Sequence, residues 1–89
     1  MLMGDALYNL RRYPEAAENY DRAGNAGPYP GFAFYNAGRS WALAGDRDRA
    51  LTSVEKAVAT GFIADRRAMG NDPDLASIKD DPRFQKPMQ

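Results

Sequence analysis

The chain has 89 residues, with twelve Lys and Arg against twelve Asp and Glu, and it contains neither cysteine nor histidine. Nucleic acids and anionic membranes both attract a basic excess, so this balance argues against either as a partner. The missing residue types would supply thiol nucleophiles, common zinc ligands and the usual general base, so an enzyme is not expected. We therefore expect one small domain that needs no cofactor.

The first third of the chain predicts a pair of helices. Apolar residues at helical spacing predict a short helix over residues 1–10, and Arg11 and Arg12 suit its C-terminal end. Pro14 suits the first turn of a second helix. The apolar stripe of that helix is formed by Ala16, Ala17, Tyr20 and Ala23. Residues 24–31, GNAGPYPG, are rich in glycine and proline and are expected to break it.

The middle third, residues 31–62, predicts a second and clearer pair. Its first helix carries Phe34, Ala37, Gly38, Trp41 and Ala44 on one face, and Trp41 is expected in the core between helices. Gly45 can take the left-handed conformation that ends this helix, and Asp46 or Asp48 can cap the next one. The second helix has an uninterrupted apolar stripe formed by Ala50, Leu51, Val54, Ala57 and Val58, and Gly61 closes it.

The last third does not follow this pattern. A short helix is predicted over residues 62–69, and Asp72-Pro73-Asp74 and Asp81-Pro82 each resemble a helix start. The apolar residues Leu75, Ile78 and Phe84 are expected to cover the exposed edge of the Leu51/Val54/Val58 helix. No stretch alternates apolar and polar residues over a useful length, so the predicted fold class is all-α.

An offset of 34 residues aligns the first pair with the second. The aligned identities are Gly4 with Gly38, Ala16 with Ala50, Ala23 with Ala57, and Gly27 with Gly61. Small residues are what closely packed helices need at their crossing points, so the offset predicts an internal repeat.

The second unit resembles a tetratricopeptide repeat (TPR). The matching residues are Phe34, Tyr35, Asn36, Gly38, Trp41, Gly45, Asp46, Ala50, Val54 and Ala57. In the first unit they are Gly4, Leu7, Tyr13, Ala16, Tyr20, Ala23 and Pro28. The tail DPDLASIKDDPRF is similar to a segment that often follows the last repeat of bacterial TPR proteins. The resemblance implies antiparallel helix-turn-helix repeats stacked as a short α-solenoid: a truncated first repeat (1–30), a complete second repeat (31–62) and an irregular helical C-terminal cap (63–89).

The function implied by the resemblance is binding of a peptide or protein segment in the groove lined by the first helix of each repeat. The groove positions carry over to Phe32, Tyr35, Asn36, Arg39 and Leu43 in the second unit, and to Asp5, Tyr8 and Asn9 in the first. Tyr35 would supply rigid contact area, Asn36 would hold backbone amides and Arg39 would pair with a carboxylate. In the alternative interpretation, Phe32 and Tyr35 pack against the neighbouring unit and Arg39 pairs with Asp5.

Two further expectations concern partners and location. The family's clamp for a C-terminal carboxylate needs a lysine at position 1 and an asparagine at position 5; the chain has Met1 and Asp5 there, so that ligand is not expected. A second function is a structural end-cap or docking segment of a larger TPR protein, with Leu2, Met3 and Leu7 against upstream repeats or a second copy. The absence of cysteine slightly favours the cytoplasm, and export stays open if the chain is a fragment.

Overall fold

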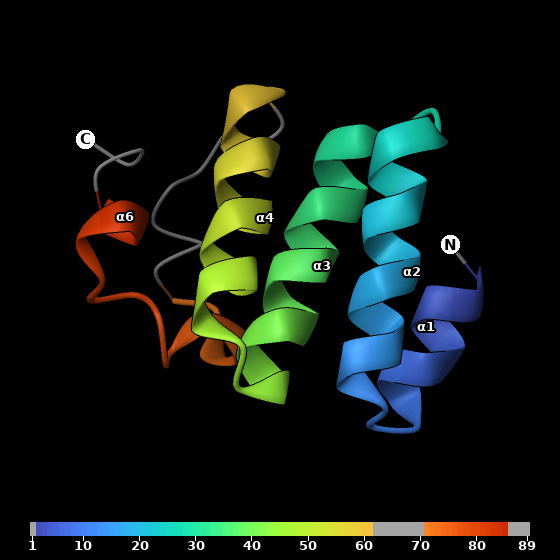
Figure 1. Ribbon diagram of the computed structural model, residues 1–89, viewed down its shortest axis with the longest axis horizontal. Helices are drawn as coiled ribbons and strands as arrows, with labels where there is room; N and C mark the ends of the chain where they lie inside the picture. The colour runs from blue at the N-terminus through green and yellow to red at the C-terminus, as the bar shows by residue number, and fades with distance from the viewer. Residues whose placement is uncertain (1, 62–70, 86–89) are drawn as a thin grey trace.

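The computed structural model describes residues 2–61 and 71–85, and over these the protein is all-helical, as predicted, with no strand. Four helices, α1 to α4, pack side by side in chain order (Figure 1). Their bounds are α1 Leu2–Asn9, α2 Tyr13–Ala26, α3 Pro30–Ala44 and α4 Arg47–Ala59; the 3-10 helix η1 (Pro73–Leu75) and the short helix α6 (Pro82–Gln85) follow. The helix predicted over residues 62–69 lies outside the described residues.

The turn between α3 and α4 has the hydrogen bonds that end many helices. The Asp46 backbone N–H donates to the carbonyl of Trp41 over 3.0 Å, and the Gly45 N–H donates to the carbonyl of Ala42 over 3.1 Å. Gly45 has the left-handed backbone that this Schellman arrangement requires, with a φ of 86°. The Asp46 side chain then accepts from the Arg49 N–H over 3.1 Å and caps α4, as predicted.

The turn between α1 and α2 has the same pattern 34 residues earlier. Here the Arg12 N–H donates to the carbonyl of Leu7 and the Arg11 N–H to that of Tyr8, each over 2.9 Å. Arg11 occupies the left-handed position with a φ of 60°, although it has a Cβ atom. The backbone has therefore adopted the same turn with an arginine where the second pair has Gly45.

Each pair also crosses at a glycine. A Cβ atom added to Gly4 of α1 would lie 2.8 Å from the Tyr20 ring of α2, and one added to Gly38 of α3 would lie 2.7 Å from a Val54 methyl of α4. Any larger residue would push these helices apart, so the glycines set how closely they approach.

The helix break predicted within residues 24–31 is confirmed, but it lies at residues 27–29. Helix α2 continues to Ala26, and Gly24 is one of its buried residues. The reason is tertiary packing, because the Phe34 ring lies where the side chain of any other residue would begin, with Phe34 Cε1 2.6 Å from an added Cβ. The glycine serves the contact between α2 and α3, and the helix ends only before Gly27.

The C-terminal segment is attached to the helices by its apolar residues. Leu75, Ile78 and Phe84 are fully buried in the same core as Leu51 and Val54, as expected. Helix η1 packs on α3, and α6 packs on α4. Both predicted start signals form caps, because the Asp72 and Asp81 side chains each accept a backbone N–H two residues later over 2.9 Å. This segment thereby reaches the helix that was predicted to line a groove.

Candidate functional site

A hollow of about 390 Å³ lies between α1 and α3, and we call it the α1–α3 recess. It is lined by Asp5, Tyr8, Asn9, Tyr20, Phe32, Asn36 and Arg39. All but Tyr20 belong to the eight groove residues predicted from the sequence. The other two predicted residues, Tyr35 and Leu43, do not line it: Tyr35 contacts the C-terminal segment, and Leu43 is 37% exposed on α3.

Arg39 is engaged by the chain's own C-terminal segment. Its Nη2 atom lies 2.8 Å from Oδ2 of Asp74, and its Nε atom lies 3.2 Å from Oδ2 of Asp72. Its Nη1 atom donates to Oδ1 of Asn36, one helical turn earlier, over 3.1 Å. The predicted alternative partner Asp5 is wrong, because two carboxylates from η1 reach the guanidinium instead.

Two tyrosines complete this arrangement. The Tyr35 hydroxyl donates to Oδ2 of Asp72 over 2.7 Å, and the Tyr8 hydroxyl donates to Oδ2 of Asp74. The Arg39 guanidinium carbon also lies 5.5 Å and 5.9 Å from the centres of the Tyr8 and Tyr35 rings, within the range of cation–π attraction. We call these residues the Arg39 cluster: Tyr8, Tyr35, Arg39, Asp72 and Asp74. The cluster binds the C-terminal segment to both α1 and α3.

The protonation states in the Arg39 cluster follow from burial and pairing. Burial and the hydrogen bond to Asp74 raise the pKa of Tyr8 to about 12. Burial and the bond to Asp72 likewise raise the pKa of Tyr35. Burial lowers the pKa of Arg39, but its two carboxylate partners outweigh that effect and raise it overall. At neutral pH the tyrosines are therefore neutral donors and the arginine is charged.

The Asp5 side chain is held in position by a hydrogen bond from Tyr20. The buried Tyr20 hydroxyl donates to Oδ1 of Asp5 over 2.6 Å, and burial, followed by this bond, raises the pKa of Tyr20. The second oxygen, Oδ2, accepts no hydrogen bond from the residues that the structure describes, and the side chain is exposed. Asp5 thus presents a positioned carboxylate at the α1 wall of the recess.

The recess and the Arg39 cluster together are acidic. Three carboxylates, those of Asp5, Asp72 and Asp74, stand against the single guanidinium of Arg39. Sequence reasoning placed one arginine and one aspartate here, Arg39 and Asp5, because it considered only the helices. The two aspartates that make the place acidic are 33 and 35 residues after Arg39, and only the fold brings them there.

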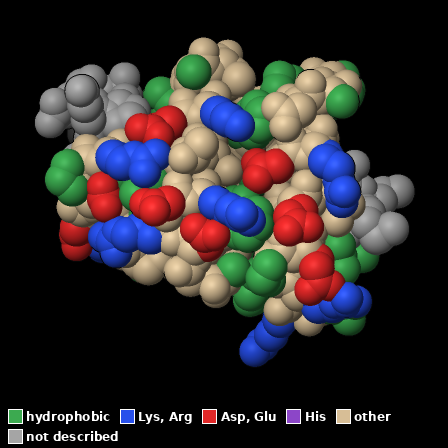
Figure 2. Space-filling view, in the orientation of Figure 1, with side chains coloured by type: hydrophobic (Ala, Val, Ile, Leu, Met, Phe, Trp, Pro, Cys, Tyr) green, Lys and Arg blue, Asp and Glu red, His purple; other side chains and the backbone are tan. Residues whose placement is uncertain are grey.

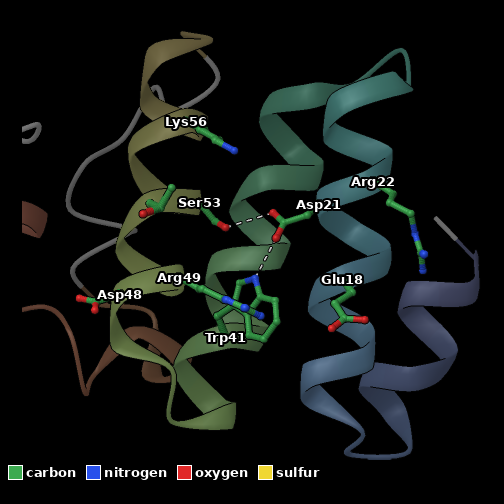
Figure 3. Close-up of a pocket in the computed structure, with 9 residues that line it drawn as sticks. Glu18, Asp21, Arg22, Trp41, Asp48, Arg49, Ser53 and Lys56 are labelled. Atoms are coloured by element: carbon green, nitrogen blue, oxygen red, sulfur yellow. Dashed lines mark hydrogen bonds between the residues drawn. The ribbon is translucent and has the colours of Figure 1, made fainter.

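A second hollow, of about 530 Å³, lies between α2 and α4 on the face shown in Figure 3. Three acidic and three basic side chains line it together with Trp41, Thr52 and Ser53. Figure 2 shows this face of the molecule with acidic and basic groups interleaved and no region of one sign. Such balance is typical of a solvated surface.

The floor of the second hollow is a polar contact between three helices. Asp21 of α2 accepts the indole N–H of Trp41 of α3 over 2.8 Å and the hydroxyl of Ser53 of α4 over 3.1 Å (Figure 3). The Arg49 guanidinium covers the Trp41 ring at 4.8 Å. Trp41 is buried in the core as predicted, but sequence reasoning missed Asp21. The only indication in the sequence of a structural role for Asp21 was its position directly after the core residue Tyr20. Both of its oxygens are used, so we assign Asp21 to stability.

The described ranges, 2–61 and 71–85, contain no group of three or more His, Cys, Asp or Glu that could hold a metal ion. None of the helices in these ranges is long and apolar enough to cross a bilayer. The α1–α3 recess is the candidate site, because six of the eight predicted groove residues line it.

Comparison with known proteins gives no significant match to a family model, a curated protein or a solved structure.

Proposed function

We propose that the chain is a TPR-like interaction module that binds a segment of a partner protein in the α1–α3 recess. In this proposal α1–α2 is a truncated repeat and α3–α4 a complete one. They form a short solenoid that the C-terminal segment caps. No reaction is assigned to it.

The repeat assignment is supported by two correspondences at the same offset of 34 residues. The turns after α1 and α3 share one hydrogen-bonding pattern, and the pairs cross at Gly4 and Gly38. A shared turn and a shared crossing point are what a structural repeat produces, because each unit must pack on the next in the same way.

One observation carries the binding assignment: six of the eight residues that the resemblance placed in a groove line a single hollow. The hollow combines aromatic surface from Tyr8 and Phe32 with amide and carboxylate groups from Asn9, Asn36 and Asp5. Aromatic anchors beside a few polar groups are characteristic of protein interfaces.

The test is a selection of peptides from a random library on the full chain, followed by titration of a selected peptide with two variants. Phe32 and Leu43 are both exposed apolar residues of α3, but only Phe32 lines the recess. Phe32→Ala should weaken binding roughly tenfold, and the control Leu43→Ala should leave it nearly unchanged. Circular dichroism checks that both variants fold. Equal binding by the Phe32→Ala variant would refute the proposed site.

A second candidate function is a structural end-cap with no ligand of its own. The Arg39 cluster favours this function. In it, three of the predicted groove residues contact the chain's own C-terminal segment and not a partner: Tyr8, Tyr35 and Arg39. The docking face predicted for this role includes Leu2 and Met3, whose side chains lie outside the described residues; Leu7 packs against the core.

Light scattering over a wide concentration range separates the two functions. An end-cap with an unpaired docking face should associate as its concentration rises. Replacement of Leu10, the exposed residue that follows α1, by Lys should suppress this association. A concentration-independent monomer that binds selected peptides in the recess would favour the interaction module.

A further inference from the structure

We infer that the α1–α3 recess is selective for a positively charged side chain, a lysine or arginine in the bound segment. This inference rests on the proposed function and names the chemistry of its ligand. It reverses the expectation from the sequence, in which Arg39 would pair with a ligand carboxylate.

Arg39 is not available to a ligand carboxylate. Its side chain is 30% exposed, and the carboxylates that hold it, Asp72 and Asp74, are 14% and 18% exposed. Leu75, which follows Asp74 directly, is fully buried in the core and fixes η1 in place. A ligand carboxylate would have to displace an anchored internal one, so Arg39 is not a free cation for a partner.

The recess offers a ligand one carboxylate and two aromatic side chains. Asp5 has an oxygen that accepts no bond from the described part of the chain, and Tyr20 holds the carboxylate in position. Tyr8 and Phe32 supply aromatic surface in the same hollow. A carboxylate beside aromatic faces is a favourable environment for a lysine or arginine head group.

The charges around the recess also favour a basic ligand. An acidic ligand would be repelled by Asp5, Asp72 and Asp74, and only the paired Arg39 would offset this repulsion. A basic ligand would be attracted by the same excess of negative charge. The hollow between α2 and α4 has no such preference, because its three acidic and three basic groups balance. The preference for a basic ligand is therefore a property of the recess and not of the hollow between α2 and α4.

The experiment uses the full ¹⁵N-labelled chain and three pools of acetylated, amidated octapeptides. The pools share randomised neutral positions and differ in two central residues, which are Lys/Arg, Asp/Glu or Ser/Asn. Amide shifts of recess residues report where each pool binds. We expect the basic pool to shift them most, and the shifts to weaken as salt is raised from 20 to roughly 300 mM, over which the Debye length shortens.

A matched pair of variants tests the role of Asp5. Asp5→Asn removes the charge but keeps an oxygen that can accept from Tyr20, and Asp80→Asn removes the same charge from an exposed site outside the recess. Asp5→Asn should weaken a basic peptide about twofold to fivefold, as expected for a partly exposed charge pair, whereas Asp80→Asn should not. The salt dependence of the unmodified chain provides the test if a variant fails to fold.

The outcomes separate the two proposals. If the acidic or neutral pool shifts the recess signals as strongly as the basic pool, the charge preference is refuted but binding in the recess stands. If no pool shifts them, the proposed function fails and the inference with it. Equal losses for Asp5→Asn and Asp80→Asn would reduce the effect to net charge and overturn the assignment to Asp5.

Discussion

Arg39 shows how a residue expected at a binding surface becomes part of the fold. It joins α3 to η1 through Asp72 and Asp74, and it lies beside the rings of Tyr8 and Tyr35. Removal of the guanidinium would leave two largely buried carboxylates facing each other, with two tyrosine hydroxyls and the Asp74 backbone N–H as their remaining donors. Partly buried charges that lose their partner are costly, in contrast to exposed pairs.

We expect Arg39→Met to lower the free energy of unfolding by about 2 kcal/mol, since the pair is mostly but not fully buried. The matched control is Arg47→Met, because Arg47 pairs with Asp81 at 2.9 Å but is 55% exposed. Its cost should stay below about 1 kcal/mol. Urea unfolding measures both. Equal costs would show that Arg39 contributes no more than a surface ion pair.

Arg11 has a left-handed backbone that a side chain disfavours. Arg11→Gly should therefore raise the free energy of unfolding by about 1 kcal/mol, the usual cost of that conformation for a residue with a Cβ atom. Arg12, the next residue, has a φ of −91° and pairs with Glu15, so Arg12→Gly should not stabilise. A lower stability of the Arg11→Gly variant in urea would contradict the strain.

At the scale of elements, the helix pairs are fixed by their crossing points and turns. The existence of these pairs could be predicted because apolar periodicity, Pro14, Gly45 and Asp46 are local signals. The continuation of α2 through Gly24 could not, because the Phe34 ring that requires the glycine comes from another helix. The local sequence therefore predicted the positions of the helices well, but it did not predict which side chains contact their small residues.

The crossing of α3 and α4 gives a test at this scale. Gly38→Ala would place a methyl group 2.7 Å from a Val54 methyl and 3.3 Å from the Ala50 carbonyl oxygen. We expect a loss of about 1–3 kcal/mol from overpacking. The double variant with Val54→Ala should lose less than the sum of the two single changes, because the second change removes the clash. Strict additivity in thermal or urea unfolding would place the cost elsewhere.

At the scale of the molecule, the C-terminal segment joins the helices through both an apolar core and the Arg39 cluster. The sequence allowed prediction of its buried residues, Leu75, Ile78 and Phe84, because few other apolar residues were available there. The position of its aspartates was not predictable, because no spacing relates residue 72 or 74 to α3 before the chain is folded. Six predicted recess residues were found by family resemblance, but the charge of their surroundings was not.

Three tyrosines make the whole molecule sensitive to high pH. Tyr8, Tyr20 and Tyr35 have pKa values raised above 10.0 in the folded state, mainly by burial. Their stabilising effect is complete below pH 10 and is lost as the pH rises toward the folded values, because the unfolded chain releases these protons first. The urea midpoint should fall above pH 10, and less steeply for Tyr35→Phe. A midpoint unchanged up to pH 12 would contradict the shifts.

The contact between η1 and Arg39 means that different parts of the chain determine the shape and the charge of the recess. Helices α1 and α3 supply the walls, but Asp72 and Asp74 belong to a segment that lines none of it. The paired change Asp72→Asn and Asp74→Asn should keep, through the amide oxygens, the cap on the Asp74 backbone N–H and the acceptor for the Tyr8 hydroxyl. It removes one acceptor at position 72, where Oδ2 accepts from Tyr35, and it uncovers the charge of Arg39. The same cavity should then lose its preference for basic peptides, because the charges of Asp5 and Arg39 would balance. Two substitutions in the C-terminal segment would thus change the ligand preference of the recess, although every residue that lines the recess stays the same.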